Sequence, residues 1–471
     1  MSGPVRWLRP RPFDGSSASF AEHTEAIGRI MARPTDGPPE RLWLGPFEPP
    51  EQLPPRLERT VLVVPTSGST GAAKAVALDR EALLASQDAT AALLGGPAGA
   101  LSGHGFWLPL LPPTHIAGIQ VIARAHRTAQ LRDLAAAALP DPLPDLSTGF
   151  GTEMFRRAAR TALVRAEAAG LPALTSLVPT QLVRILADAE ATALLARFAG
   201  VLVGGAATAP ADLTAARAAG VAVRTTYGSS ETAGGCVYDG VPLPGVHLLL
   251  EDGEAGTGRL RISSPTLALG YLRRDGTAED GGAFSPASSE PDRCPSFLTS
   301  DLARLEDGRL RILGRADDVI ITGGRKVLPQ DVEAAILAHP ALARQVQAVV
   351  VVGVPDAEWG QRITALVVPH PVTSRDGAGH DGTGQEDRGQ ENRGREDTVR
   401  DDTASAVDAG AAVPSAVLAA RLRTALRDGP LPAHAVPKAV LAVAALPLLG
   451  IGKIDRAAAR RIAEAALPLP S

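Results

Sequence analysis

Patterns typical of buried strands and of helices alternate along the first half of the chain. An apolar run rich in β-branched residues at 61–64 is typical of a buried strand, and similar runs recur at 174–178, 200–203 and 221–226. Helical patterns follow several of these runs, and residues 106–125 read as a strand, a proline-rich turn and a helix. This repetition predicts an α/β fold with a mostly parallel sheet, helices on both faces, and ligands at the carboxyl ends of the strands.

After Gly245 the pattern changes to short strands and turns, which predicts an antiparallel β subdomain with a hairpin turning at Asp307-Gly308. Beyond it the sequence predicts a smaller α+β domain, so we expect a large domain over 1–314 and a C-terminal domain over 315–471. Within the latter, the stretch 372–412 is dense in glycine and charged residues and has no aromatic side chain. It buries too little apolar surface to offset its ordering entropy, which predicts a disordered insertion.

Composition and charge argue against several classes of function. A chain of 471 residues with a net charge of -4 gives no electrostatic footprint for a nucleic-acid partner. No apolar signal segment opens the chain, and nowhere is an uncharged apolar run long enough to span a bilayer. We therefore expect a cytoplasmic protein without an integral membrane segment. Cys236 and Cys294 belong to no metal or disulfide motif, which predicts two reduced thiols.

The buried run at 61–64 leads into a stretch of hydroxyls and glycines, Thr66 to Gly71, followed by Lys74. Glycines let a backbone approach a ligand, successive amides bind anions, and a lysine adds a mobile positive charge. Only four of the 47 basic residues are lysines, which makes Lys74 and Lys453 conspicuous. The spacing is not that of a P-loop, because the sequence continues as a short strand rather than a helix. The alternatives are a phosphate-binding loop and a hairpin turn without a ligand.

Four further motifs follow along the chain: YGSSET at 227–232, TSD at 299–301, GRADD at 314–318 and GIGKIDR at 450–456. Together with the glycine-rich loop, they resemble the ordered motifs of the adenylate-forming enzymes (acyl-CoA synthetases, adenylation domains and luciferases) over roughly residues 60–460. That family joins a carboxylate to the α-phosphate of ATP with loss of pyrophosphate. The resemblance therefore implies ATP, Mg²⁺, CoA and a small-molecule carboxylic acid as partners, and a small C-terminal domain that moves.

The same resemblance implies a role for each motif residue. The phosphates would be held by Thr66, Ser67, Gly68, Ser69, Thr70, Gly71 and Lys74. Further nucleotide contacts would come from Gly204, Gly205, Tyr227, Gly228, Thr232, Asp301 and Arg315. In this scheme Tyr227 packs on the adenine, Thr232 contacts the α-phosphate, and Asp301 accepts the ribose hydroxyls. Glu231 would hold Mg²⁺, a hard ion suited to a carboxylate.

In the C-terminal domain, the resemblance makes Lys453 the ammonium that bridges the substrate carboxylate and the α-phosphate; the alternative is a surface lysine. Asp317 aligns with the hinge about which the small domain turns between the two half-reactions. Gly323 and Gly324 would face the pantetheine arm of CoA. The family's usual lysine in that motif is here Ile321, and the phosphate loop lacks its usual proline and glycine.

A finer resemblance, to the o-succinylbenzoate-CoA ligases of menaquinone biosynthesis, is carried by the stretches 114–124, 175–182 and 227–246. It implies an acid pocket that includes His115, Arg124, Thr180 and Ser229, with His115, Thr232 and Lys453 as the catalytic residues. His115 could instead be a capping or core histidine. Arg124 lies in an apolar helical run, so it either meets the second carboxylate of o-succinylbenzoate or points outward into a surface ion pair.

Three other functions remain open from the sequence. The first is a ligase for another aryl or fatty acid, and the second is a freestanding adenylation domain that loads a carrier protein. The third is a nucleotide-binding protein without catalysis, which the presence of Lys74, Glu231, Asp301 and Lys453 disfavours.

Overall fold

The computed structural model describes residues 6–32, 40–65, 74–95, 103–254, 256–279, 282–285, 294–370, 412–427, 429, 431–449 and 453–467. The chain divides into two compact units: the first comprises Met1–Ile312 and Ile451–Lys453, and the second comprises Leu313–Gly450 and Ile454–Ser471. Two sequence-based predictions lie outside the described residues: the phosphate loop at 66–71 and the insertion at 372–412, except for residue 412. Within the described residues, no helix is long and apolar enough to cross a membrane.

The centre of the first unit is a six-stranded sheet in the order β10-β9-β8-β7-β6-β5. Its strands are β5 (Phe106–Leu108), β6 (Ala173–Leu177), β7 (Gly200–Val203), β8 (Val223–Ser229), β9 (Gly234–Tyr238) and β10 (Val241–Pro242). Strands β5 to β8 are parallel, and β9 and β10 continue the sheet antiparallel. The predicted mostly parallel α/β sheet is confirmed.

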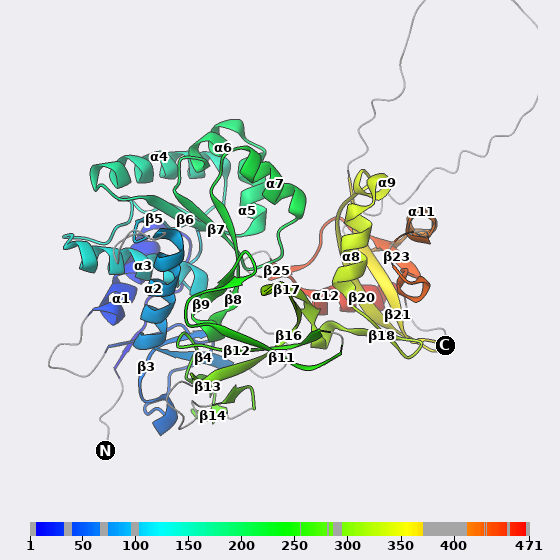
Figure 1. The fold of residues 1–471 in the computed structure, drawn as a ribbon, viewed down its shortest axis with the longest axis horizontal. Coiled ribbons are helices and arrows are strands. Elements are labelled where there is room, and N and C mark those ends of the chain that lie inside the picture. The colour runs from blue at the N-terminus through cyan, green and yellow to red at the C-terminus, as the bar shows by residue number, and fades with distance from the viewer. Residues whose placement is uncertain are drawn as a thin grey trace, which may run out of the picture. The chain divides into compact units, whose positions relative to one another are not determined.

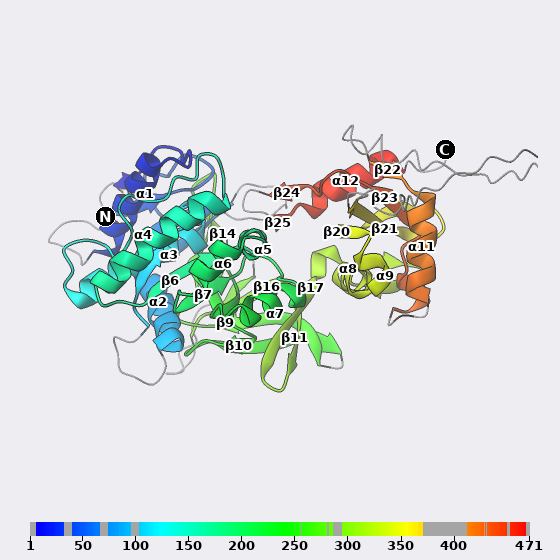
Figure 2. The same cartoon turned by 90° about the horizontal axis from the view of Figure 1, so that it is seen from above.

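Helices cover both faces of this sheet (Figures 1 and 2). On one side, α2 (Arg80–Gly95) and α3 (Ile116–Arg132) pack on β5, β6 and β9, and α1 (Ser17–Met31) packs on α3. On the other side are α4 (Thr152–Ala168), α5 (Pro179–Leu186), α6 (Ala189–Leu195) and α7 (Pro210–Ala218). Pro210 occupies the first turn of α7, where its missing N–H costs nothing. A large apolar core fills both interfaces, with Phe20, Trp107 and Phe155 among its buried side chains.

A second sheet of the first unit runs in the order β1-β2-β3-β4-β13-β14. Its strands are β1 (Trp7–Leu8), β2 (Arg41–Trp43), β3 (Thr60–Pro65), β4 (Lys74–Asp79), β13 (Gly270–Arg273) and β14 (Ala278–Glu279). The predicted short strand after the glycine-rich stretch is β4, which pairs antiparallel with β3. Asp79 then caps α2, because its Oδ1 accepts the amide hydrogen of Ala82 at 2.8 Å.

The predicted antiparallel subdomain is a third sheet, in the order β11-β12-β16-β15 with β17 beside β16. Its strands are β11 (His247–Glu254), β12 (Thr257–Ser263), β15 (Phe284–Ser285), β16 (Ser296–Glu306) and β17 (Arg309–Arg315). The hairpin between β16 and β17 turns at Asp307 and Gly308, whose φ angles of 50° and 74° are those of a type I′ turn. The sequence located this turn correctly.

The second unit is a smaller α+β body. Its main sheet contains β18 (Ile320–Thr322), β19 (Arg325–Val327), β20 (Val346–Asp356), β21 (Gly360–Pro369), β22 (Val413–Pro414) and β23 (Ala439–Ala442). The helices that pack on it are α8 (Pro329–Ala338), α9 (Pro340–Ala343), α11 (Ala416–Arg427) and α12 (Arg456–Ala466). A short pair, β24 (Leu448–Leu449) and β25 (Lys453–Ile454), precedes α12.

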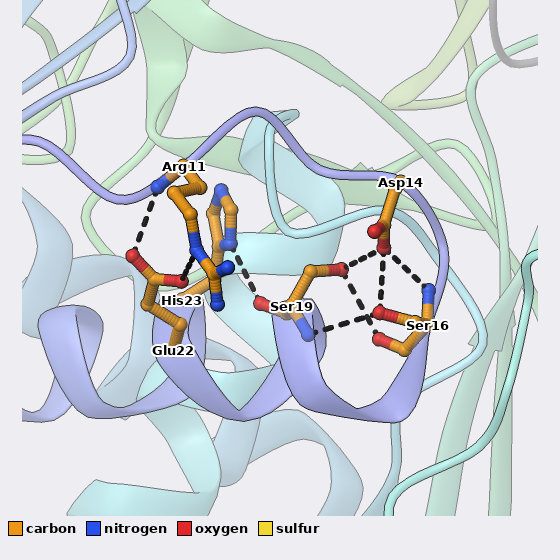
Figure 3. A network of polar contacts seen from close by, with 6 residues as sticks. All are labelled: Arg11, Asp14, Ser16, Ser19, Glu22 and His23. Carbon is orange, nitrogen blue, oxygen red and sulfur yellow. Dashed lines mark hydrogen bonds and ion pairs between the residues drawn. The ribbon is translucent and has the colours of Figure 1, made fainter.

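The start of α1 is held by a polar network (Figure 3). One carboxylate oxygen of Asp14 accepts hydrogen bonds from the amide and hydroxyl of Ser16 and from the hydroxyl of Ser19, at 2.6 to 2.8 Å. Ser16 is the N-cap, and its hydroxyl accepts the amide hydrogen of Ser19. These bonds satisfy donors that a helix terminus otherwise leaves unpaired, and they lower the pKa of Asp14 to about 2.

Candidate active site

The carboxyl ends of β5 to β8 bring together predicted residues that lie far apart in the sequence. Leu177 aligns with Val203, and Val203 with Thr225, so these parallel strands end at one edge of the sheet. Predicted residues that follow directly on these strands or end them include His115, Thr180, Gly204, Gly205, Tyr227, Gly228 and Ser229. Such an edge is where ligands bind in open α/β sheets.

Two of these glycines are required by close packing. A Cβ on Gly204 would lie 2.1 Å from Oγ1 of Thr226, and one on Gly228 would lie 2.0 Å from the carbonyl oxygen of Gly234. Any side chain at these positions would therefore force β7, β8 or the following turn to shift. The glycines keep the ends of the strands close to one another.

Tyr227 and Asp301 join the end of β8 to the middle of β16. The hydroxyl of Tyr227 donates to Oδ2 of Asp301 at 2.6 Å, and the amide of Asp301 donates to Oγ1 of Thr299 at 3.0 Å. Burial and the charge of Asp301 raise the pKa of Tyr227 above its ordinary value. The phenol therefore remains a donor across the neutral pH range, and it fixes the orientation of the carboxylate.

Lys74 and Glu231 meet through a third residue, Tyr271. The ammonium of Lys74 lies 4.0 Å from the centre of the Tyr271 ring, and the hydroxyl of that tyrosine donates to Oε1 of Glu231 at 2.8 Å. The antiparallel pairing of β4 with β13 creates this arrangement, since Lys74 stands opposite Arg273. Lys74 also lies 3.9 Å from Oε1 of Glu279.

Tyr271 is a residue that the sequence reasoning missed. The chain has only three tyrosines, and each of their hydroxyls engages a polar partner: Tyr227 with Asp301, Tyr238 with Thr90, and Tyr271 with Glu231. The scarcity of tyrosine was therefore a usable signal, of the same kind as the scarcity of lysine.

Thr232 braces the turn that carries Glu231. This turn is the 3₁₀ helix η2 (Ser230–Thr232), and the hydroxyl of Thr232 accepts from the amide of Ser229 at 2.9 Å and donates to the carbonyl of Gly234 at 2.7 Å. Thr232 is only 1% exposed. Its expected contact with the α-phosphate stays a prediction; in this structure the hydroxyl orders the turn.

Arg124 is buried in the core of the first unit. It is 6% exposed, and its Nη2 donates to Oγ1 of Thr90 at 3.0 Å, with the guanidinium carbon 5.4 Å from the centre of the Trp107 ring. Burial lowers the pKa of Arg124, an effect that Tyr238 partly opposes. The outward-pointing surface ion pair is therefore wrong.

The arrangement also separates Arg124 from His115. His115 is the extended N-cap that precedes α3, and Arg124 lies nine residues further on, about two and a half helical turns along the helix. The free space beside the guanidinium is too narrow for a water molecule. The structure thus places Arg124 in the core and does not bring it together with His115 in one acid pocket.

In the second unit, the predicted hinge and CoA residues lie near its first strands. Arg315 directly precedes η3 (Ala316–Asp318) and forms an exposed ion pair at 3.2 Å with Asp317 within it. Gly323 and Gly324 have φ angles of 55° and 73° and turn β18 into β19. The side chain of Lys453 lies outside the described residues.

A charge network holds the start of α12 to the body of the second unit. The two terminal nitrogens of Arg456 donate to the two carboxylate oxygens of Glu333, each at 2.8 Å, and Nη1 also donates to the carbonyl of Val351 at 2.9 Å. A bidentate pair of this kind, more than four-fifths buried, has a defined geometry.

Known proteins resemble the chain in both units. The family model for the AMP-binding enzyme C-terminal domain matches residues 331–382. The structure of ATP-bound MatB from Rhodopseudomonas palustris is 22% identical with a TM-score of 0.59 and covers 85% of this chain and 68% of its own. The o-succinylbenzoate CoA synthetase from Bacillus subtilis, in complex with its acyl-adenylate intermediate, is 20% identical with a TM-score of 0.56, covering 84% and 68%. These likenesses show the fold of the AMP-binding, adenylate-forming enzymes.

Sequence relatives define the family more closely. The probable 2-succinylbenzoate–CoA ligase of Mycobacterium tuberculosis is 43% identical over 312 residues, which are 65% of this chain and 70% of that protein. The 2-succinylbenzoate–CoA ligase of Salmonella typhimurium is 33% identical over 66% of this chain and 58% of its own length. The chain belongs to the family of 2-succinylbenzoate–CoA ligases.

Proposed function

We propose that the protein is an ATP-dependent acid-thiol ligase that converts o-succinylbenzoate into its CoA thioester in menaquinone biosynthesis. The observations that carry this proposal are two contacts in the first unit. Tyr227 donates a hydrogen bond to Asp301, and Lys74 and Glu231 both contact Tyr271. The relatives supply the identity of the acid, since the names they carry specify it.

The reaction has two steps. A carboxylate oxygen of the acid attacks the α-phosphorus of ATP, the bond to the β-phosphate breaks, and pyrophosphate leaves. The sulfur of CoA then attacks the acyl carbonyl carbon, the bond to AMP breaks, and the thiol proton passes to solvent. The first step brings two anions together, so the site must supply positive charge and oriented donors.

The nucleotide would be held at both of its ends by the residues described above. Asp301, oriented by Tyr227, would accept the ribose hydroxyls, because an ionised carboxylate offers acceptors in two directions. Gly204, Gly205 and Gly228 keep backbone free of side chains at the edge where the base would lie. Lys74, on the strand that leaves the 66–71 loop, would neutralise the phosphates. Arg315 stays a proposed partner of the ribose.

The residues present fit Mg²⁺, which typically takes one or two carboxylates together with substrate phosphates. Glu231 offers such a carboxylate, half-buried and oriented by Tyr271. No cluster of three or more metal-binding side chains occurs among the described residues, so a closed all-protein metal site is absent there. When bound, Mg²⁺ would offset phosphate charge in the transition state. Glu231 would fix its position relative to Lys74.

Lys453, His115, Thr180 and Ser229 complete the proposal. Lys453 would bring its ammonium to the carboxylate and the α-phosphate in the first step only, with Asp317 as the hinge and the Gly323-Gly324 turn at the CoA arm. His115, at the N-cap of α3, and Thr180, in the first turn of α5, would face the acid at the strand ends. Arg124 lies beside Thr90 and Trp107 rather than beside these residues, so its place in the acid pocket stays a prediction.

The test is pyrophosphate release measured against a panel of carboxylic acids, with and without CoA. We expect o-succinylbenzoate to give the highest kcat/KM and to yield a thioester when CoA is present. A higher value with a fatty or plain aryl acid would make the protein a different acid-CoA ligase. Adenylate formed but never passed to CoA would support the loading of a carrier protein instead.

A further inference from the structure

The backbone carbonyl of Ala233 accepts two hydrogen bonds from buried side chains, neither of which was predicted as a site residue. Oγ of Ser86 donates to it at 3.0 Å, and Nε2 of Gln120 donates at 2.8 Å. Ser86 lies on α2 and Gln120 on α3, and the two side chains are 0% and 1% exposed. Two helices distant in sequence therefore converge on one oxygen, directly after the turn that carries Glu231.

The orientation of the Gln120 amide is set by its neighbour. Nε2 of Gln87 donates to Oε1 of Gln120 at 3.2 Å, so the nitrogen of Gln120 is left to face the carbonyl. A buried polar group without a partner costs about 1–3 kcal/mol, and this arrangement therefore resists rotation of the amide. The donor is fixed before any ligand arrives.

The carbonyl that these donors hold belongs to a residue in an unfavourable backbone conformation. Ala233 has a φ of 48°, in the left-handed region, which costs an L-residue with a Cβ roughly 1–2 kcal/mol. This conformation ends η2 and reverses the chain into β9. The two hydrogen bonds offset that cost, and they fix the position of the turn relative to the sheet.

Glu231 is thereby held from three sides. Its own carbonyl accepts the amide hydrogen of Ala268 at 2.8 Å, its carboxylate accepts from Tyr271, and the turn that follows it is anchored at Ala233. Removal of the anchor at Ala233 would leave the first two contacts intact but would allow the turn to relax.

We propose that Ser86 and Gln120 are positioning residues that hold Glu231 where it meets the divalent cation bound with the nucleotide. This inference rests on the proposed function, because it requires Mg·ATP to be the ligand of the site. Neither side chain reaches the ligand. Both act through the carbonyl of Ala233.

The test is calorimetric binding of ATP, with Mg²⁺ and with a chelator, to the wild type and to the Ser86→Ala and Gln120→Leu variants. Partners that orient a metal-binding residue typically contribute 10–100-fold to metal affinity, so we expect the gain in ATP affinity from Mg²⁺ to fall about tenfold in each variant. Affinity for Mg²⁺-free ATP should stay at the wild-type level. Ser86→Thr, which retains the hydroxyl, should restore the gain.

Thr90→Val is the matched control. Thr90 lies one turn from Ser86 on α2 and belongs to the same buried network, but its hydroxyl contacts Tyr238, Arg124 and the carbonyl of Ser86. It should lower the melting temperature while retaining the full Mg²⁺ gain. Faster hydrogen exchange of amides 231–234 in Ser86→Ala and Gln120→Leu, but not in Thr90→Val, provides a readout independent of ligand.

The outcomes separate this inference from the proposed function, because no acid is present in the binding experiment. An unchanged Mg²⁺ gain in the two variants would overturn the positioning role alone. Equal losses with and without Mg²⁺, matched by Thr90→Val, would show a general effect on folding and would overturn it as well. A wild type that turns over a different acid but shows the expected Mg²⁺ pattern would overturn the proposed substrate and leave the positioning role supported.

Discussion

Gln120 and Arg124 stand one turn apart on the same face of α3, both are buried, and their surroundings differ. Gln120 and its neighbour Ser86 on α2 donate to the backbone of the turn that carries Glu231. Arg124 is surrounded by Thr90, Trp107 and Tyr238 and contacts no predicted site residue among those described. A shift of about 6 Å along one helix thus separates polar groups that serve the candidate site from polar groups that serve the core.

The difference shows why burial of a polar residue in an apolar helix does not by itself identify a ligand site. Whether a buried polar residue of this helix can reach a ligand depends on which end of the strands it lies beside. The first turn of α3 lies beside the carboxyl ends of the strands, where ligands bind, whereas the helix then runs back along β5 toward the opposite edge. The following predictions test whether residues at the two ends behave as this comparison requires, beginning with the largest expected effect.

Glu231→Gln should abolish most adenylate formation and leave the fold intact. The amide oxygen can still accept from Tyr271, but the negative charge proposed to hold Mg²⁺ is lost. Loss of one such electrostatic contact typically costs roughly 10² to 10³ in rate. Pyrophosphate exchange measures the activity and thermal unfolding measures the fold. Normal exchange in this variant would exclude Glu231 from the metal site.

Tyr227→Phe should raise the KM for ATP by about tenfold, because a hydrogen bond to a charged group contributes about 1.5–3 kcal/mol. Since burial and Asp301 raise the pKa of Tyr227, the hydroxyl does not ionise between pH 6 and 9 and the effect should be independent of pH over that range. Tyr238→Phe is the matched control, because the hydroxyl of Tyr238 lies 3.1 Å from Thr90, beside Arg124. A rise in the KM for ATP in the control would show that residues near Arg124 also affect the nucleotide, and it would contradict the contrast drawn above.

Arg124→Met should change kinetics little. A swap that keeps the volume of a buried side chain usually costs less than about 1.5 kcal/mol, and removal of a buried cation offsets the loss of its contacts. We therefore expect a small change in melting temperature and KM values for the acid and for ATP near those of the wild type. A strong rise in KM for o-succinylbenzoate alone would return Arg124 to the acid pocket, as the sequence suggested.

Asp14→Asn should have the smallest effect, confined to stability and to pH. The pKa of Asp14 is lowered from 3.8 to about 2 in the folded protein (Figure 3). A lowered folded-state pKa stabilises the fold above the unfolded value, and this contribution is lost as pH falls from about 4 toward 2. The wild type should therefore unfold at a slightly higher temperature than the variant at pH 7, with the difference shrinking below pH 4. A constant difference down to pH 2 would contradict the assignment.

The fold was largely predictable because its signals are local. Apolar β-branched runs located β3, β6, β7 and β8, Asp79 marked the start of α2, and Asp307-Gly308 marked a hairpin. Helices α4, α6 and α12 were missed, although each carries buried apolar positions at helical spacing. Their sequences are rich in alanine, a small side chain that marks an apolar face less clearly than leucine or isoleucine does.

The site was less predictable because its geometry depends on pairing between distant segments. Motif order named Lys74 and Glu231, but their meeting through Tyr271 requires the pairing of β4 with β13 across almost 200 residues. The surroundings of Arg124 depend on the same kind of long-range packing. A nine-residue spacing gives a distance along a helix, whereas the face that each side chain occupies depends on the angle around it.

The bidentate pair between Arg456 and Glu333 has a consequence for Lys453. Two residues separate the two positions, so the α-carbon of Lys453 stays within about 11 Å of that of Arg456, whatever conformation the intervening chain adopts. Arg456 is fastened to α8 and to β20, and Asp455 caps α12 beside it. Lys453 is therefore joined by a short segment to a residue whose position is fixed. Insertion of two residues between Lys453 and Arg456 would lengthen that segment by more than half. The volume within reach of the ammonium would then be several times larger.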